Sequence, residues 1–248
     1  TSETAIYSMF HIWVKSVEDL PLMVMQTCNV YRYETKNTKP LIRVREIPWN
    51  EAHTAHATRE EALDVLEQFW GCVHHIFTDQ LSIDGLRLRR PEWDKFPGAE
   101  HTDVLDIVMP CGRVLQSVGA HYLGQHFSKV FDIKANGENS YMTCIGISTR
   151  ALAAVLSMHG DDDGLVLPSV IAPYQIIIVP IIGKKPDQEL LTKLDEMKEQ
   201  LINAGFRVRV DLNPQKRPGE KYYYYQMKGV PLRIDFGSRD LKENKFVL

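Results

Sequence analysis

The chain has 248 residues, of which 44% are hydrophobic and 25% are charged, and its formal net charge is −3. This composition is ordinary for a globular protein, and it disfavours a general nucleic-acid coating protein, which usually carries an excess of Lys and Arg. The four cysteines form no CxxC pair, so we expect no structural zinc site, and a reduced cytosolic compartment fits best. No apolar run approaches the roughly 20 residues of a membrane span, and we expect no membrane partner.

Hydrophobic spacing predicts helices and hairpin-linked strands in the first part of the chain. Ile6, Phe10 and Trp13 recur at spacings of three and four residues, which places them on one face of an opening helix. Thr58-Arg59-Glu60-Glu61 is a capping-box signature and opens a second helix. The expected elements are a helix at Thr4–Val17, strands at Leu22–Tyr33 and Leu41–Ile47, a helix from the capping box to about Phe77, strands at Val104–Met109, Arg113–Val118 and near Tyr141, and a helix at Ile147–Met158. Hairpin connections favour an antiparallel sheet flanked by helices.

The composition changes at Asp161-Asp162-Asp163-Gly164, an acidic break that is followed by Pro168 and Pro173. Beyond it, strands and helices alternate, which is typical of a small α/β domain with a covered mixed sheet. The expected elements are a strand at Gln175–Ile182, a helix at Pro186–Ala204, a strand at Phe206–Val210, a helix near Lys221, a strand at Leu232–Phe236 and a terminal strand from Phe246. We therefore expect an α/β protein of two domains, residues 1–168 with an α+β organisation and residues 169–248.

Arginines gather on the first expected hairpin. Alternation places Arg32 and Glu34 on one strand face, and Arg43 and Arg45 on one face of the next strand. Several guanidinium groups on one sheet surface suit a polyphosphate, because each planar fork holds two phosphate oxygens. The alternative is a solvated sheet face with surface ion pairs.

The segment from Trp49 to His56 carries a carboxylate and imidazoles beside the arginine face. Glu51 would receive the ammonium of a small zwitterion, and Trp49 would form the wall for an apolar ring. His53 and His56 are three residues apart and would form a metal pair if the segment were helical, but no third ligand has matching spacing. The remaining alternative is a polar connector with one buried Trp.

Arg150 lies early in an apolar helix, where its charge is unfavourable for the helix dipole. It either extends to solvent or points into a site as an anion clamp. A ridge of polar residues precedes it, and its alternative is an ordinary polar loop. The ridge consists of Gln116, Ser117, His121, Gln125, Ser128 and Lys129.

Together these segments resemble prolyl-tRNA synthetases of the archaeal and eukaryotic type along nearly the whole chain. Motif 2 of class II synthetases is similar to Arg32-Tyr33-Glu34 and Arg43-Val44-Arg45-Glu46, and motif 3 to Gly146-Ile147-Ser148-Thr149-Arg150. The more specific matches are Thr1-Ser2-Glu3, the string Trp49 to Thr58, Arg90 to Glu100, Gly124 to Lys129, Arg217 to Lys221 and Gly229 to Arg233. The resemblance implies that motif 1 lies before Thr1 and that no editing insertion separates motifs 2 and 3.

The resemblance implies a class II catalytic domain at residues 1–168 and an anticodon-binding domain at 169–248. Arg32 would bridge the α-phosphate of ATP and the proline carboxylate, and Arg43 and Arg150 would hold the outer phosphates. Further ATP contacts would come from Glu34, Gln116 and Thr143. The amino-acid pocket would contain Thr1, Glu3, Arg32, Trp49, Glu51, His53 and His121. The expected anticodon contacts are Arg217, Lys221, Lys228 and Arg233.

The resemblance also implies partners and a reaction. A proline–tRNA ligase would use ATP with Mg²⁺ and would charge tRNA(Pro) in the cytoplasm, with no zinc or other metal held by side chains of this chain. It would form a homodimer through the motif 1 region. Two alternatives stay open: another class IIa synthetase, specific for threonine, histidine or glycine, and a non-catalytic paralogue that binds RNA or regulates.

Overall fold

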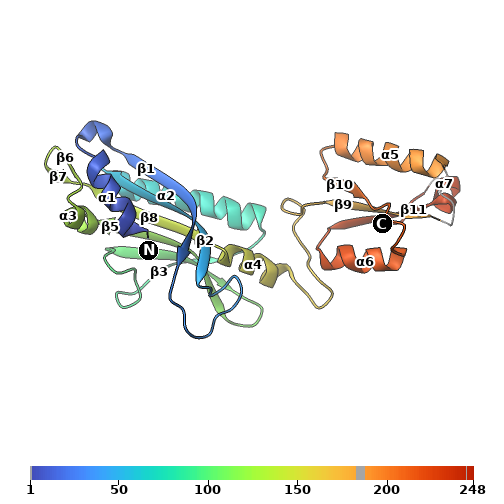
Figure 1. Ribbon diagram of the computed structural model, residues 1–248, viewed down its shortest axis with the longest axis horizontal. Coiled ribbons are helices and arrows are strands. Elements are labelled where there is room, and N and C mark those ends of the chain that lie inside the picture. Colours follow the sequence, from blue (N-terminus) through green and yellow to red (C-terminus); the bar gives the residue numbers. More distant parts are fainter. Residues whose placement is uncertain (1, 183–187, 244) are drawn as a thin grey trace. The chain divides into compact units, whose positions relative to one another are not determined.

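The computed structural model describes residues 2–182, 188–243 and 245–248. The chain divides into two compact units, Thr1–Met158 and His159–Leu248 (Figure 1). Among the residues described, no helix is long and apolar enough to cross a membrane.

The first unit is built on a six-stranded antiparallel sheet with the order β1-β2-β8-β5-β4-β3. Its strands are β1 (Leu22–Tyr31), β2 (Glu46–His56), β3 (Leu86–Arg89), β4 (His101–Val108), β5 (Val114–Gly124) and β8 (Tyr141–Ser148). The sheet confirms the expected antiparallel architecture. The chain reaches the central strand β8 last, so residues far apart in the sequence become neighbours on one surface.

Two helices cover opposite faces of this sheet. Helix α1 (Glu3–Trp13) packs Tyr7 and Phe10 into a core cluster with Ala55, Met142 and Cys144. Helix α2 (Arg59–His74) contacts β2, β5 and β8 and stacks its Trp70 on Arg87 of β3. Because side chains alternate along a strand, the face under α1 carries Cys144 and its strand partner His53, and the face under α2 carries Thr143 and its partner Thr54.

Local chemistry explains where these helices begin. Thr58 accepts a hydrogen bond from the Glu61 amide at 3.2 Å, and the Glu61 carboxylate returns bonds to the amides of residues 57 and 58, so the predicted capping box is confirmed. The α2 helix continues into a π-helical turn at His75–Gln80. The remaining elements of the unit are a short 3-10 helix (Val17–Asp19), α3 (His126–Phe131), the β6–β7 pair (Lys134–Ala135 and Glu138–Asn139) and α4 (Arg150–His159).

The second unit is a parallel three-stranded sheet of order β10-β9-β11 with helices α5 and α6 on opposite faces (Figure 1). Its elements are β9 (Ile176–Ile181), α5 (Gln188–Asn203), β10 (Val208–Val210), α6 (Pro218–Met227), β11 (Leu232–Gly237) and α7 (Ser238–Glu243). Alternate residues of β9 pack with α5 and with α6, so the strand is an almost continuous apolar run. The predicted α/β alternation is therefore confirmed, and the expected helix start at Pro186 lies outside the described residues.

Two of the expected strands differ most from the structure. The strand predicted at Leu41–Ile47 is a loop as far as Arg45, because Pro40 and the left-handed backbone of Leu41 (φ 61°) interrupt extended pairing. Strand β2 starts at Glu46 instead and contains the whole Trp49–His56 segment. At the C-terminus a single bridge between Asp235 and Val247 follows α7 in place of the expected strand.

Candidate active site

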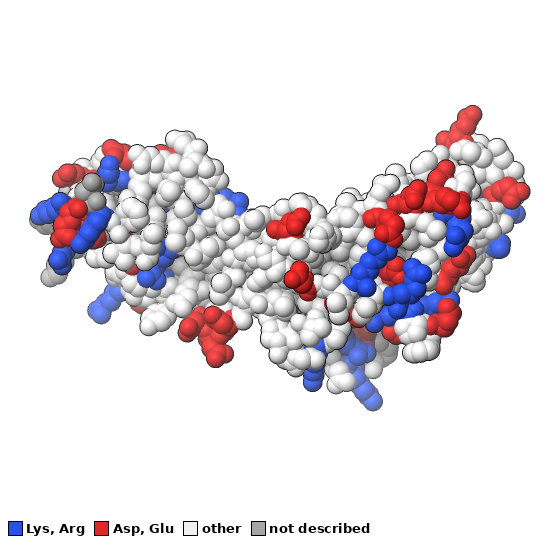
Figure 2. All heavy atoms as spheres, turned by 180° about the vertical axis from the view of Figure 1, so that it is seen from behind, with Lys and Arg blue, Asp and Glu red and all other residues white. Residues whose placement is uncertain are grey.

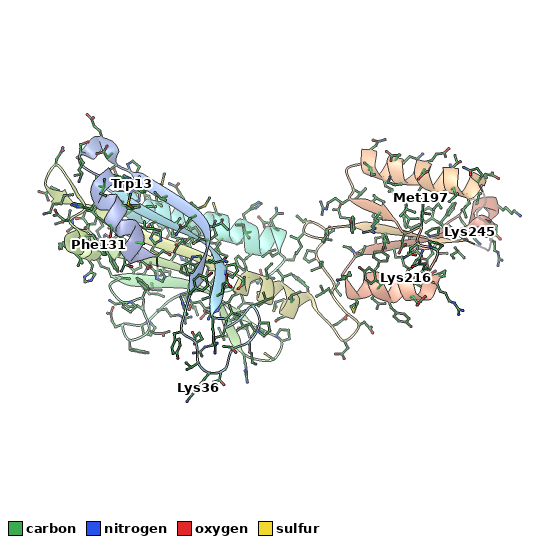
Figure 3. The ribbon with its side chains drawn as sticks, in the orientation of Figure 1. Trp13, Lys36, Phe131, Met197, Lys216 and Lys245 are labelled. Atoms are coloured by element: carbon green, nitrogen blue, oxygen red, sulfur yellow. The ribbon has the colours of Figure 1, made fainter. Side chains whose placement is uncertain are left out.

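A cavity of about 370 Å³ opens on the α1 face of the first unit. Its walls come from α1, β2, β5, β8, α4 and the loop between β1 and β2, and Lys36 lies at the outer end of that loop (Figure 3). Most residues expected at the site line this cavity: Glu3, Arg32, Glu34, Arg43, Trp49, Glu51, Gln116, His121 and Arg150. The chain therefore brings together the arginine cluster, the Trp49–Glu51 pair and the motif around Arg150.

Strand register creates the floor of this cavity. Glu51 of β2 pairs with Gly146 of β8, which pairs with Gly119 of β5. Two glycines on adjacent strands remove the side chains that would otherwise fill the space beside Glu51, which is the role of a glycine where a ligand approaches the backbone closely. Sequence reasoning named Gly146 only as part of the motif 3 segment and missed Gly119. Their signal was glycine inside otherwise apolar strands.

Three guanidinium groups line one end of the cavity. Arg150 donates from Nε to the Ile42 carbonyl at 2.9 Å and from Nη1 to the Gln116 carbonyl at 3.3 Å, and its side chain is partly buried. Burial lowers the pKa of Arg150, and the nearby charges of Arg32 and Arg43 lower it further. Three like charges that repel one another in this way are a site for a polyanion.

The loop that carries the other two guanidinium groups has internal support. Arg43 holds the Glu34 carboxylate through Nε at 2.9 Å and Nη2 at 2.8 Å, and Arg45 donates to the Glu34 carbonyl at 2.8 Å. Arg32 lies one residue past the end of β1, and its exposed side chain lines the cavity and pairs with no carboxylate in the described part of the chain. The strand alternation predicted for Arg32, Glu34 and Arg43 is therefore wrong, but the loop still gathers them.

Two buried carboxylates line the opposite end. Glu3 is 3% exposed and Glu51 is 1% exposed, and the Oε2 atom of each has no aligned hydrogen-bond partner. Burial raises the pKa of Glu51, but hydrogen bonds from His53, Ser2 and Gln26 outweigh it, and the net pKa lies below the usual value. Glu51 is thus ionised at neutral pH, and the Oε2 atoms of Glu3 and Glu51 can accept hydrogen bonds from a cationic ligand.

Aromatic rings form the remaining walls. Trp49 is half-buried, with its indole Nε1 buried and unpartnered, and Phe96 lies over the His121 ring with centroids 4.7 Å apart. Phe96 lies within the Arg90 to Glu100 segment that carries part of the resemblance, and no hydrophobic periodicity indicated a role for it. Burial lowers the pKa of His121 to about 4. Its imidazole is therefore neutral at physiological pH and accepts from or donates to Thr102 at 2.9 Å.

The shift at His121 predicts a pH dependence of stability. Its folded pKa of about 4 lies below the ordinary value, so its contribution is fully present above about pH 6.5 and is lost as the pH falls towards about pH 4. Denaturant unfolding across this window should show a steeper fall for the wild type than for His121→Gln. The matched control is His126→Gln, which changes an exposed histidine of α3 and should keep the steep fall. If the unfolding free energies of the wild type and His121→Gln fell in parallel with pH, the lowered pKa of His121 would be contradicted.

Several predicted contacts do not reach the cavity. His53 is fully buried behind Glu51, and Thr143 lies on the α2 face, where its hydroxyl bonds Thr54 at 2.5 Å, so the nucleotide contact predicted for Thr143 is wrong. Thr1 lies outside the described residues. In the polar ridge, Ser128 is buried and donates to the Gln125 carbonyl, because this part of the ridge caps and forms α3 instead of lining the cavity.

No group of three or more His, Cys, Asp and Glu side chains that could hold a metal ion occurs within residues 2–182, 188–243 and 245–248. The free cysteines among them are Cys28, Cys72, Cys111 and Cys144, and none is paired in a disulfide.

Family models match both units. The tRNA synthetase class II core domain (G, H, P, S and T) matches residues 1–159, and an anticodon binding domain matches residues 175–248. The chain belongs to the class II tRNA synthetases. The family expected from the motif 2 and motif 3 segments is thereby confirmed, together with the order of its two domains.

Individual relatives are similar to this chain along nearly its whole length. The proline–tRNA ligase of Methanosarcina mazei is 52% identical over 250 residues, which are 98% of this chain and 52% of that protein. A structure of Giardia lamblia prolyl-tRNA synthetase in complex with prolyl-adenylate has a TM-score of 0.94 and 52% identity, over 99% of this chain and 52% of that one. The enzyme of Cryptosporidium parvum, complexed with L-proline and AMP, has a TM-score of 0.93 and 39% identity, over 99% of this chain and 54% of that one. The chain spans about half the length of the relatives it matches.

Proposed function

We propose that this chain carries the active site of a proline–tRNA ligase, which activates proline with ATP and transfers it to tRNA(Pro). The observation that carries the proposal is the charge distribution of the cavity. Arg32, Arg43 and Arg150 line one end, and the buried carboxylates of Glu3 and Glu51 line the other. This arrangement fits a polyphosphate joined to a small zwitterion, because each charge of the ligand meets its opposite.

The ammonium of proline explains why two carboxylates are needed. A secondary ammonium carries two hydrogens, and Glu3 Oε2 and Glu51 Oε2 are two buried acceptors. Among the described residues Glu3 Oε2 has no aligned donor, and Glu51 Oε2 has only the poorly aligned His53 Nε2 at 3.2 Å. A buried acceptor without an aligned donor costs free energy, so the pocket favours a cation with two donors. Trp49 and Phe96 supply apolar walls for the pyrrolidine ring.

The first chemical step follows from this placement. A carboxylate oxygen of proline attacks the α-phosphorus of ATP, a new C–O–P bond forms, and the bond to the β-phosphate breaks to release pyrophosphate. Arg32 would hold the α-phosphate against the attacking carboxylate, and Arg43 and Arg150 would hold the leaving phosphates. In the second step a ribose hydroxyl of the tRNA's terminal adenosine attacks the carbonyl and AMP leaves. Catalysis here is by positioning and charge stabilisation, with no covalent intermediate on the protein.

ATP would enter with Mg²⁺. Phosphate oxygens and water supply most of the ligands that Mg²⁺ prefers, and one carboxylate suffices from the protein. Glu34 is the carboxylate nearest to the arginine cluster, but Arg43 holds it at 2.8 Å, so it is a candidate ligand only if that pair opens.

Amino-acid-dependent ATP–pyrophosphate exchange by the full-length protein tests the proposal. We expect exchange with proline and at most weak exchange with threonine, histidine or glycine. Exchange driven by one of those three instead would assign the chain to a sister synthetase. No exchange with any of the four would favour the non-catalytic paralogue.

The proposed tRNA contacts of the second unit divide by exposure. Arg217 and Lys228 are exposed on and beside α6. Arg233 is half-buried, donates to Asp235 at 3.0 Å and stacks on Tyr222 with its guanidinium 3.9 Å from the ring centroid. Basic and acidic side chains are interspersed on the face shown in Figure 2, so on that face an RNA would meet local cations and no broad basic field.

Lys221 is a correction to the predicted anticodon contacts. It is 4% exposed, and its Nζ lies 2.6 Å from the Asp211 carbonyl and 3.3 Å from Asp211 Oδ1, so it faces the interior. Lys221→Met should destabilise the second unit by about 3 kcal/mol, because it removes the cation that pairs with the Asp211 carboxylate and leaves that carboxylate with neutral donors only, and it should leave the salt dependence of tRNA binding unchanged. Lys228→Ala should do the reverse and reduce the salt slope by about one. Denaturant unfolding and binding measured at several salt concentrations distinguish the two, and a reduced salt slope for Lys221→Met would contradict its burial.

Four further properties of the whole protein are part of the proposal. They are a homodimer formed through the motif 1 region, a cytoplasmic location, tRNA(Pro) as the RNA partner and a domain boundary at residue 168. The boundary near residue 168 stays a prediction, and the compact units divide after Met158.

A further inference from the structure

Behind the cavity, two buried polar side chains that no step of the proposed reaction uses form a row with Glu51. The Tyr7 hydroxyl lies 3.0 Å from His53 Nδ1, and His53 Nε2 lies 3.2 Å from Glu51 Oε2. Tyr7 and His53 are 0% exposed, and Glu51 is 1% exposed. A fully buried row of three polar side chains that ends on a ligand-facing carboxylate is expensive to bury, so it requires a role.

We propose that Tyr7 and His53 are positioning residues: this buried chain orients the Glu51 carboxylate towards the cavity and keeps it ionised, so that it receives the ammonium of the amino-acid substrate. The proposal rests on the proposed function for the identity of that substrate. It also reassigns His53, which was expected to contact the amino acid directly, to a place behind the residue that does.

Packing fixes the donor end of the chain. Tyr7 meets the rings of Phe10, Phe127 and Phe131 at centroid distances of 5.7, 5.3 and 5.9 Å. The same Tyr7 ring meets the His53 ring edge-on, with centroids 5.3 Å apart and planes at 84°. Glu3 and Tyr7 are four residues apart on α1, so one face of this helix presents both the Glu3 carboxylate of the cavity and the Tyr7 hydroxyl, which is the first group of the Tyr7–His53–Glu51 row. A hydroxyl held in this way can act on the imidazole in one geometry only.

Protonation states give the chain a direction. Burial raises the pKa of Tyr7, and the neighbouring Cys144, Glu3 and Glu51 raise it further, so Tyr7 keeps its hydrogen and donates. Glu51 is ionised and only accepts. Because Glu51 only accepts, the hydrogen of a neutral His53 imidazole lies on Nε2, facing Glu51 Oε2, and Nδ1 accepts from the Tyr7 hydroxyl. The contact is not aligned as a hydrogen bond, and neither atom has another aligned partner among the described residues; such contacts often tighten when a ligand binds.

Other groups also face Glu51. Gln26 donates to Glu51 Oε1, and Cys28 Sγ lies 4.0 Å from the same oxygen. The titratable groups packed around Glu51 come from α1, β1, β2, β5 and β8: Glu3, Tyr7, Cys28, His53, His121 and Cys144. The thiol of Cys144 has a pKa raised by burial and by Glu3, and His121 is neutral because burial lowers its pKa to about 4. Among these six groups, His53 is the one whose ring nitrogen, Nε2, lies 3.2 Å from Glu51 Oε2.

The test is Tyr7→Phe in the full-length protein, which keeps the packed ring and removes the hydroxyl. We expect the KM for proline in pyrophosphate exchange to rise about tenfold, the loss of one hydrogen bond to a charged network, with kcat and the KM for ATP nearly unchanged. The acid limb of the pH profile of kcat/KM for proline should move to higher pH, because Glu51 loses the support that lowers its pKa. The matched control is Tyr122→Phe, which removes a buried hydroxyl without an aligned partner from the same unit and should change none of these.

Variants at His53 separate positioning from packing. His53→Gln keeps an acceptor for Tyr7 and a donor for Glu51 and should retain a KM for proline well below that of His53→Ala. Adding Tyr7→Phe to His53→Ala should have no further effect, because the chain is already broken. A lower unfolding free energy for Tyr7→Phe with an unmoved KM and an unmoved acid limb would mean that the hydroxyl is merely structural, and it would overturn the proposal.

A readout without turnover separates this inference from the proposed function. ¹⁵N NMR of the wild type should show the His53 hydrogen on Nε2, and ¹³C NMR of the Glu51 carboxyl should show a pKa that rises in Tyr7→Phe. A hydrogen on Nδ1, or an unchanged Glu51 titration, would overturn the chain of contacts. These NMR signals test the Tyr7–His53–Glu51 row even if proline fails to support pyrophosphate exchange. That failure would contradict the proposed function only.

Discussion

Arg32→Ala should reduce kcat/KM for proline-dependent pyrophosphate exchange about a thousandfold, since removal of one donor that stabilises developing charge typically costs a factor of this order. The side chain of Arg32 is exposed and lines the cavity, and its backbone amide, not its guanidinium, holds the loop by donating to the Arg45 carbonyl at 2.8 Å. The free energy of unfolding should therefore change by less than about 0.5 kcal/mol. The fall in kcat/KM would then come from the lost guanidinium and not from unfolding of the protein.

The control for Arg32→Ala is Lys36→Ala. Lys36 is an exposed cation of the same loop, lies at its outer end (Figure 3) and is absent from the cavity lining. It should exchange pyrophosphate at the wild-type rate. Equal losses for the two variants would show that the loop contributes only its general positive charge, and a wild-type rate for Arg32→Ala would remove Arg32 from the proposed mechanism.

Glu51→Gln should raise the KM for proline about a hundredfold and leave the KM for ATP nearly unchanged. The amide keeps the shape of the side chain but removes the negative charge that meets the ammonium, and a buried charge pair that loses one partner costs about 3 kcal/mol or more. Because the pKa of Glu51 is lowered, the wild-type carboxylate stays ionised at lower pH than an ordinary glutamate does. The variant should therefore also lose the acid limb in the pH profile of kcat/KM for proline.

Glu46→Gln is the matched control for that substitution. Glu46 lies on the same strand, is exposed and accepts hydrogen bonds from Asn29 and Tyr31, outside the cavity. Its KM values should equal those of the wild type. If Glu51→Gln instead raised both KM values alike, Glu51 would support the fold of the site and would not bind the ammonium.

Side-chain chemistry made much of the site predictable. The residues alone indicated a polyphosphate site but left a solvated face open for Arg32 and Arg43, and the resemblance implied the roles of Arg32, Arg43, Arg150 and Glu51, which line one cavity. The capping box before α2 and the α/β alternation of the second unit depend on neighbours a few residues apart, and they were predicted for that reason. Strand β2 was misplaced by several residues because its last residues are covered on both faces, so no alternation of burial marks them.

What only the tertiary structure decided is which side of each element its polar groups face and what covers them. Alternation puts Glu51 and His53 on the same face, but only the packing of α1, whose Tyr7 is 46 residues away, buries His53 and leaves Glu51 at the cavity. Register alone sends Thr143 to the α2 face. The sequence predicted Lys221 as an RNA contact, but its ammonium pairs with Asp211 in the interior. The sequence by itself determined the chemical groups and the family, and long-range contacts determined which of those groups a substrate can reach.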